Sequence, residues 1–174
     1  MSNGYKAMGK DFGIKEDGES TRILVDNAWS FEIPEGFTYV VDPKPETDNV
    51  PDYVKIHILI RHKDPDVEFW LMDAQKYPSV EDVRNAESLV EMGQFHFGRL
   101  SYQIYKDDGD FIIVMAFYGT DWGNGNAVPE YMNIYVRREG HKGYDFRWVK
   151  IRVQGFEEQK ECLRKIINSI QAEN

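Results

Sequence analysis

Alternation of apolar and polar residues predicts a chain built mainly of antiparallel strands. Residues 29–33 alternate and stop at Pro34-Glu35-Gly36, because Pro34 lacks a backbone donor. Residues 22–25 precede them across Asp26-Asn27, which favours a hairpin. Further strands are expected at residues 37–41, 54–61, 67–72, 100–104, 111–118, 131–136 and 144–153.

Two of these strands carry distinct burial patterns. The first has apolar residues at alternate positions, Val54, Ile56, Ile58 and Ile60, separated by Lys55, His57, Leu59 and Arg61. This alternation predicts a half-buried strand with a helix against its apolar face. Residues 111–118 are apolar at both parities. That pattern predicts an interior strand covered on both faces.

The last predicted strand changes parity along its length. Tyr144, Phe146 and Trp148 share one face, yet the next residue on that face is Lys150, while Val149 falls on the other side with further apolar residues. One extra residue flips all later side chains to the opposite face. We therefore predict a β-bulge near Trp148 or Val149.

Two helices are predicted among the strands. Ser79 caps one at residues 79–90, and residues 156–170 form another with Leu163, Ile166, Ile167 and Ile170 on one side. The fold class is therefore α+β, an antiparallel β-sheet flanked by helices. We expect a loosely ordered tail at residues 1–20, followed by one domain at residues 21–174.

Two segments resemble a known family. Phe31-Glu32-Ile33-Pro34-Glu35-Gly36-Phe37 is similar to the first-hairpin element of PsbP-like and DcrB-like proteins, and Ile166-Ile167-Asn168-Ser169-Ile170 is similar to the end of their last helix. The same fold occurs in a Ran-binding nuclear transport factor. The resemblance implies a PsbP-like sandwich and a docking or scaffolding role, and it carries over no catalytic residue.

Charge and composition exclude several partners. The net charge of −9 is concentrated in residues 1–52, which hold five Lys/Arg against eleven Asp/Glu, so nucleic acid and anionic membranes are not expected partners. Cations between Arg137 and Arg152 are interpreted as a solvated hairpin face. The lone Cys162 forms no intramolecular disulfide, and no segment has the length of a signal peptide or membrane span. A cytoplasmic location is expected, with removal of an export signal left open.

No set of residues carries a diagnostic chemistry. His57, His62, His96 and His141 are scattered and lack metal-ligand spacing, so we predict partly exposed strand or loop positions, no metal and no cofactor. No nucleophile elbow, Cys/His signature or phosphate loop is present. The sequence therefore leans away from an enzyme and assigns no catalytic residue.

Aromatic residues give the strongest surface candidates. Tyr131 and Tyr135 point away from the apolar face of their strand, and Tyr118 and Trp122 lie just before it. These four rings are either core beneath a covering element or an exposed patch of the kind enriched at interfaces. We name Tyr118, Trp122, Tyr131 and Tyr135 as candidates for protein interaction.

Two functional hypotheses follow. The first is a non-enzymatic protein-interaction or scaffolding module that presents the Trp122 loop to a protein partner. The second is a small-ligand-binding protein or undiscovered enzyme with a cleft between sheet and helix near His57 or His96. Partner identity and oligomeric state are not determined by the sequence.

Overall fold

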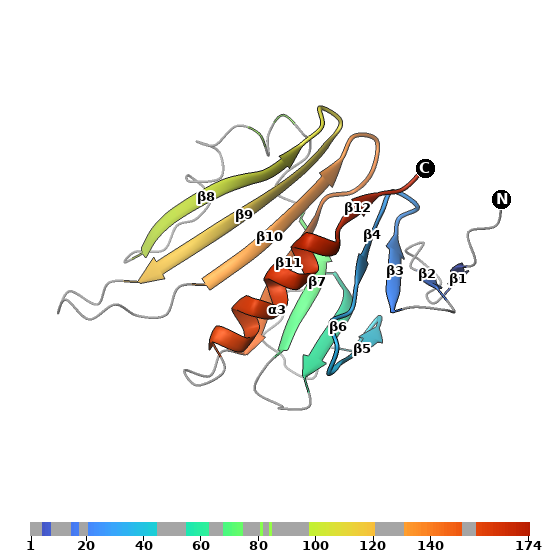
Figure 1. The fold of residues 1–174 in the computed structure, drawn as a ribbon, viewed down its shortest axis with the longest axis horizontal. Coiled ribbons are helices and arrows are strands. Elements are labelled where there is room, and N and C mark those ends of the chain that lie inside the picture. Colours follow the sequence, from blue (N-terminus) through green and yellow to red (C-terminus); the bar gives the residue numbers. More distant parts are fainter. Residues whose placement is uncertain are drawn as a thin grey trace.

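The computed structural model describes residues 5–7, 15–17, 21–44, 55–62, 68–74, 81, 84, 98–120, 131–150 and 156–174. These residues form a mostly antiparallel β protein with two sheets and a C-terminal helix, α3 (Phe156–Ser169), as Figure 1 shows. The expected antiparallel sheet and the last helix are confirmed. The predicted helix at residues 79–90 lies outside the described residues except for Glu81 and Arg84, both helical.

The larger sheet has seven strands in the order β5-β6-β7-β11-β10-β9-β8, and each described pair is antiparallel. Hairpin connections therefore dominate it, as expected from the alternating segments. Its strands are β5 (Phe37–Val41), β6 (Ile56–His62), β7 (Glu68–Asp73), β8 (Gly98–Asp107), β9 (Phe111–Thr120), β10 (Tyr131–Arg138) and β11 (Tyr144–Lys150).

The smaller sheet has the order β1-β2-β3-β4-β12 and joins the two ends of the chain. Its strands are β1 (Tyr5–Ala7), β2 (Lys15–Asp17), β3 (Arg22–Val25), β4 (Trp29–Glu32) and β12 (Gln171–Ala172). The segment expected to be a loose tail thus contains two short strands. The pairing of β12 with β4 was not predicted from the sequence.

The β3–β4 hairpin forms as the turn residues predict. Asp26 and Asn27 have φ values of 54° and 52°, and the Ala28 amide donates to the Val25 carbonyl at 2.9 Å. Two successive residues with positive φ match the right-handed twist of the paired strands, and Asn and Asp tolerate that conformation best after Gly. The second strand ends before Pro34, as expected.

The hydrophobic core lies between one face of the larger sheet and a layer formed by α3 with the β3–β4 hairpin (Figure 1). Trp29 is fully buried, with ring centroids 5.8 Å from Phe31, 5.8 Å from Tyr144 and 6.1 Å from Phe146. The apolar side of α3 faces the same core, and its buried residues are Cys162, Leu163, Ile166, Ile167 and Ile170.

Strand β9 is interior and buried on both faces at its start. It lies between β10 and β8, and Phe111, Ile112, Ile113 and Val114 are each at most 1% exposed. Consecutive residues of a strand point to opposite faces, so both sides are covered here. The prediction of an interior strand is confirmed for these residues.

Bulges on β11 and β6 set which side chains face the core, and a further register shift lies on β8 between Ile104 and Lys106. On β11, the pairing with β7 shifts between Trp148 and Lys150, so the predicted bulge is confirmed. A second bulge on β6, between Ile56 and Ile58, was not predicted. It moves Ile56 to the second face, the face of the larger sheet that points away from α3, and places His57 on the core face.

Candidate functional site

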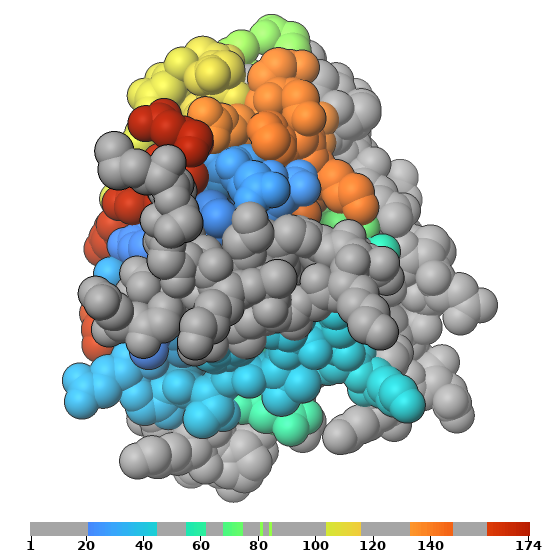
Figure 2. Space-filling view, turned by 90° about the vertical axis from the view of Figure 1, so that its right-hand side faces the viewer, coloured from blue at the N-terminus to red at the C-terminus, as the bar shows by residue number. Residues whose placement is uncertain are grey.

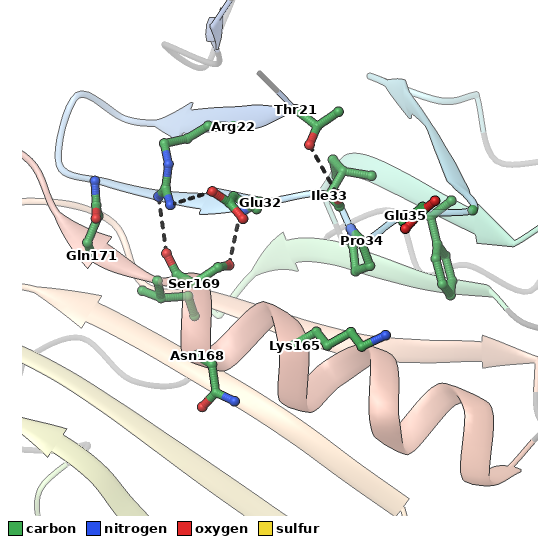
Figure 3. Close-up of a pocket in the computed structure, with 13 residues that line it drawn as sticks. Thr21, Arg22, Glu32, Ile33, Pro34, Glu35, Lys165, Asn168, Ser169 and Gln171 are labelled. Carbon is green, nitrogen blue, oxygen red and sulfur yellow. Dashed lines mark hydrogen bonds and ion pairs between the residues drawn. The ribbon is translucent and has the colours of Figure 1, made fainter. Parts of the chain in front are cut away.

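An open groove lies between the β4–β5 connection and the C-terminal end of α3. Its volume is about 1010 Å³, and Figure 3 shows its two walls. Figure 2 shows the β4–β5 connection and β5 at the surface as a cyan band below the blue hairpin. The lining residues are Thr21, Arg22, Glu32, Ile33, Pro34, Glu35, Gly36, Phe37, Lys165, Asn168, Ser169, Ile170 and Gln171.

The first wall is shaped by the end of β4. Pro34 stops the strand, and the Phe37 amide donates to the Pro34 carbonyl at 3.2 Å to close a tight turn. Gly36 occupies the left-handed region with φ of 85°, where a side chain would be strained. The Pro-Glu-Gly sequence therefore fixes the direction in which the chain leaves the hairpin and enters β5.

The second wall is the last turn of α3 and the residues after it. The Ser169 hydroxyl donates to the Ile166 carbonyl at 2.7 Å, and the Ile170 amide donates to the Ile167 carbonyl at 3.3 Å. These bonds satisfy carbonyls that a helix end leaves without an intrahelical partner. The chain then turns directly into β12.

Arg22 joins the two walls. Its Nη1 donates to the Ser169 carbonyl at 3.1 Å and to the Ser30 hydroxyl at 2.8 Å, and its Nη2 donates to Glu32 Oε1 at 3.0 Å. The Glu32 amide also donates to Ser169 Oγ at 2.9 Å. The guanidinium thus satisfies a helix-end carbonyl and neutralises an acidic lining residue at once.

The floor of the groove is apolar and its rim is polar. Ile33 and Ile170 are 4% and 7% exposed, whereas Thr21, Glu35, Lys165, Asn168 and Gln171 are exposed. Glu35 and Lys165 extend from opposite walls in Figure 3. A small apolar centre within a polar rim is the arrangement found at protein interfaces.

The groove brings together the two segments that carry the family resemblance. Residues 32–37 come from the first segment, and residues 168–170 come from the second. The sequence marked both as structural elements and did not predict that they meet. Each segment has a polar residue near the end of its strand or helix, but that feature does not show which segments meet. The contact between the two segments depends on the pairing of β12 with β4.

The structure describes three of the four aromatic residues that the sequence named as candidates for protein interaction. Tyr118 and Tyr131 are directly opposite on β9 and β10. Tyr135 is only 4% exposed, so its ring belongs to the interior and offers little surface to a partner. Trp122 lies outside the described residues.

His57 is fully buried, so the expected partial exposure was wrong. Its side chain is 0% exposed, with Nε2 2.5 Å from Asp73 Oδ1 and its ring 5.3 Å from the Tyr144 ring. The β6 bulge explains the difference, because it turns His57 from the second face toward the core. His96, the other cleft candidate, lies outside the described residues.

Burial raises the pKa of three described groups, Tyr144, Asp145 and Cys162. Desolvation raises the pKa of Asp145 to about 6, against the opposing effect of Arg147, whose Nη2 lies 3.0 Å from Asp145 Oδ2. Burial also raises the pKa of the Cys162 thiol. The thiol therefore behaves as a small core residue.

Within the described ranges, no three His, Cys, Asp or Glu side chains are placed to hold a metal ion. In that same part of the chain, no helix has the length and apolar character needed to cross a membrane. No family model, curated protein or solved structure matches the chain.

Proposed function

We propose that the chain is a non-enzymatic protein-interaction module, and that the groove between the β4–β5 connection and α3 holds a segment of its partner. The observation that carries the proposal is the groove's composition. A buried apolar floor of Ile33 and Ile170 lies within a rim of exposed polar side chains, which can exclude water at its centre and remain solvated when empty.

The hydroxyl groups of the groove favour binding over catalysis. Ser169 Oγ donates to the Ile166 carbonyl and accepts from the Glu32 amide, and Thr21 Oγ1 donates to the Ile33 carbonyl at 3.2 Å. Among the described residues that line the groove, none is His or Cys. An activated nucleophile needs a base within hydrogen-bond reach, and these hydroxyls instead bond backbone groups.

We also propose that the two layers form a PsbP-like sandwich. The support is the position of the two resembling segments, which lie on facing walls of the groove (Figure 3). A docking role is what that resemblance implies. The alternative of a ligand cleft near His57 is less favoured, because the His57 side chain is fully buried.

The aromatic surface from the sequence is a second docking proposal for the same function. Tyr118 and Tyr131 are cross-strand neighbours, and Trp122 is in the segment that connects their strands. If Trp122→Ala abolishes partner binding and a groove variant does not, docking is assigned to this aromatic surface instead of the groove.

Affinity capture with paired variants tests the groove. Asn168→Arg places a bulky side chain on an exposed wall position, and Arg is favourable near a helix C-terminus, so the fold is expected to persist. Glu139→Lys, on the exposed β10–β11 turn, is the control. A partner captured by wild type and Glu139→Lys, but lost with Asn168→Arg, supports the groove. Equal capture of every partner by both variants rejects it.

A further inference from the structure

We infer that the partner segment is extended rather than helical, and that it presents an acidic side chain to Lys165 and a basic side chain to Glu35. This inference rests on the proposed function of the groove and names the kind of partner that the groove fits.

The groove offers little apolar surface to a helix. A helix bound in a groove buries an apolar stripe across several turns. Here the floor residues Ile33 and Ile170 are 4% and 7% exposed, and among the described lining residues Pro34 and Phe37 add the only partly exposed large apolar side chains. A helical partner would therefore desolvate polar rim groups while gaining little apolar contact.

An extended segment suits the rim because its backbone groups are unpaired. The side-chain oxygen Oδ1 of Asn168 accepts a hydrogen bond from the Tyr105 hydroxyl at 2.8 Å. This leaves the side-chain NH2 group of Asn168 as a donor to a partner carbonyl. The side-chain nitrogen Nε2 of Gln171 donates to Glu173 Oε1 at 3.0 Å. This leaves the side-chain oxygen of Gln171 as an acceptor for a partner amide. Both side chains are exposed at the outer edge of the groove, where Figure 3 shows Asn168 pointing away from the β4–β5 wall and Gln171 beyond the end of α3.

The charges of the groove give the segment a direction. Arg22 and Glu32 neutralise each other at 3.0 Å. Lys165 and Glu35 are exposed on opposite walls, and neither forms an ion pair within the described residues. A segment lying between them meets opposite charges on its two sides. Complementary charges of this kind fix orientation more than they add affinity.

Selection from peptide libraries tests the inference. A random linear library displayed on phage and a second library on a fixed helical scaffold are selected against the full wild-type chain. Binders are retained when Asn168→Arg abolishes their binding. We expect retained binders from the linear library, with an apolar residue between an acidic and a basic residue. Their dissociation constants should rise about fivefold with Lys165→Gln or Glu35→Gln, and stay unchanged with Glu139→Gln.

Reselection against Lys165→Glu sharpens the test. The acidic position of the binders should become basic, while the position that meets Glu35 stays basic. Retained binders from the helical library alone, or linear binders indifferent to residues 165 and 35, overturn the inference and leave the groove proposal standing. If neither library gives binders that Asn168→Arg abolishes, the groove proposal fails, and the inference fails with it.

Discussion

Arg22 and Ser169, 147 positions apart in the chain, are joined directly, because the Arg22 guanidinium donates to the Ser169 carbonyl at 3.1 Å. This bond ties the β3–β4 hairpin to the C-terminal end of α3. It lies within the wall of the proposed docking groove, so the stability of the fold and the shape of the groove depend on the same side chain.

Replacement of Arg22 by Met should lower the free energy of unfolding by about 2 kcal/mol, because the Ser169 carbonyl and Ser30 hydroxyl lose a charged donor. Urea denaturation measures the loss. Glu32→Gln is the control, since the Glu32 side chain is 53% exposed and its ion pair should contribute less than about 1 kcal/mol. Equal losses in the two variants would contradict the role of the carbonyl contact.

Arg138 should hold the C-terminal strand in place. Its Nη1 donates to the backbone carbonyls of both Ala28 and Glu173. We expect Arg138→Met to lower stability by about 2 kcal/mol and to speed amide hydrogen exchange at Ala172 and Glu173 selectively. The exposed neighbour Glu139, changed to Ala, should do neither. Unchanged exchange at Glu173 in Arg138→Met would show that β12 is held by other contacts.

Stability should depend on pH through Asp145. Its folded-state pKa of about 6 lies above the ordinary value of 3.8, so the folded protein binds this proton more tightly than the unfolded chain does. The free energy of unfolding should therefore fall as pH rises from about 4 to about 6, by at most about 3 kcal/mol. Asp145→Asn should remove this slope and stabilise the protein at neutral pH. Denaturation midpoints across that range test the prediction, and an unchanged slope in the variant would reject it.

Gly109 should be required for its backbone conformation alone. It has φ of 85°, and a Cβ built there would meet nothing within 4 Å. We expect Gly109→Ala to lower the free energy of unfolding, measured by thermal denaturation, by about 1 kcal/mol. Gly109→Asn should lower it less, because Asn tolerates the left-handed region better. Equal effects of Ala and Asn would point to a cause other than backbone strain.

Local periodicity predicted much of the fold. The hairpin at Asp26-Asn27, the bulge beside Val149, the interior strand starting at Phe111 and the helix starting at Phe156 each depend on residues adjacent in the chain. The positive φ of a turn residue or a change of parity leaves a direct trace in the sequence.

Features that depend on distant pairing left no such trace. The β6 bulge reverses His57 and Ile56 relative to the simple alternation, and both neighbours of His57 are apolar, so the pattern offered no reason to place a bulge there. The groove likewise requires Gln171 to pair with Ser30. Two residues of strand are too few for a periodicity to be recognised.

The pairing of β12 with β4 also constrains biosynthesis. Gln171 and Ala172 are translated long after Trp29 and Ser30, the residues of β4 with which they pair, yet they complete the smaller sheet. While those residues remain inside the ribosome, that edge of β4 has no strand to pair with, and contacts between such distant residues form slowly. The smaller sheet therefore closes only after residues 171 and 172 have left the exit tunnel.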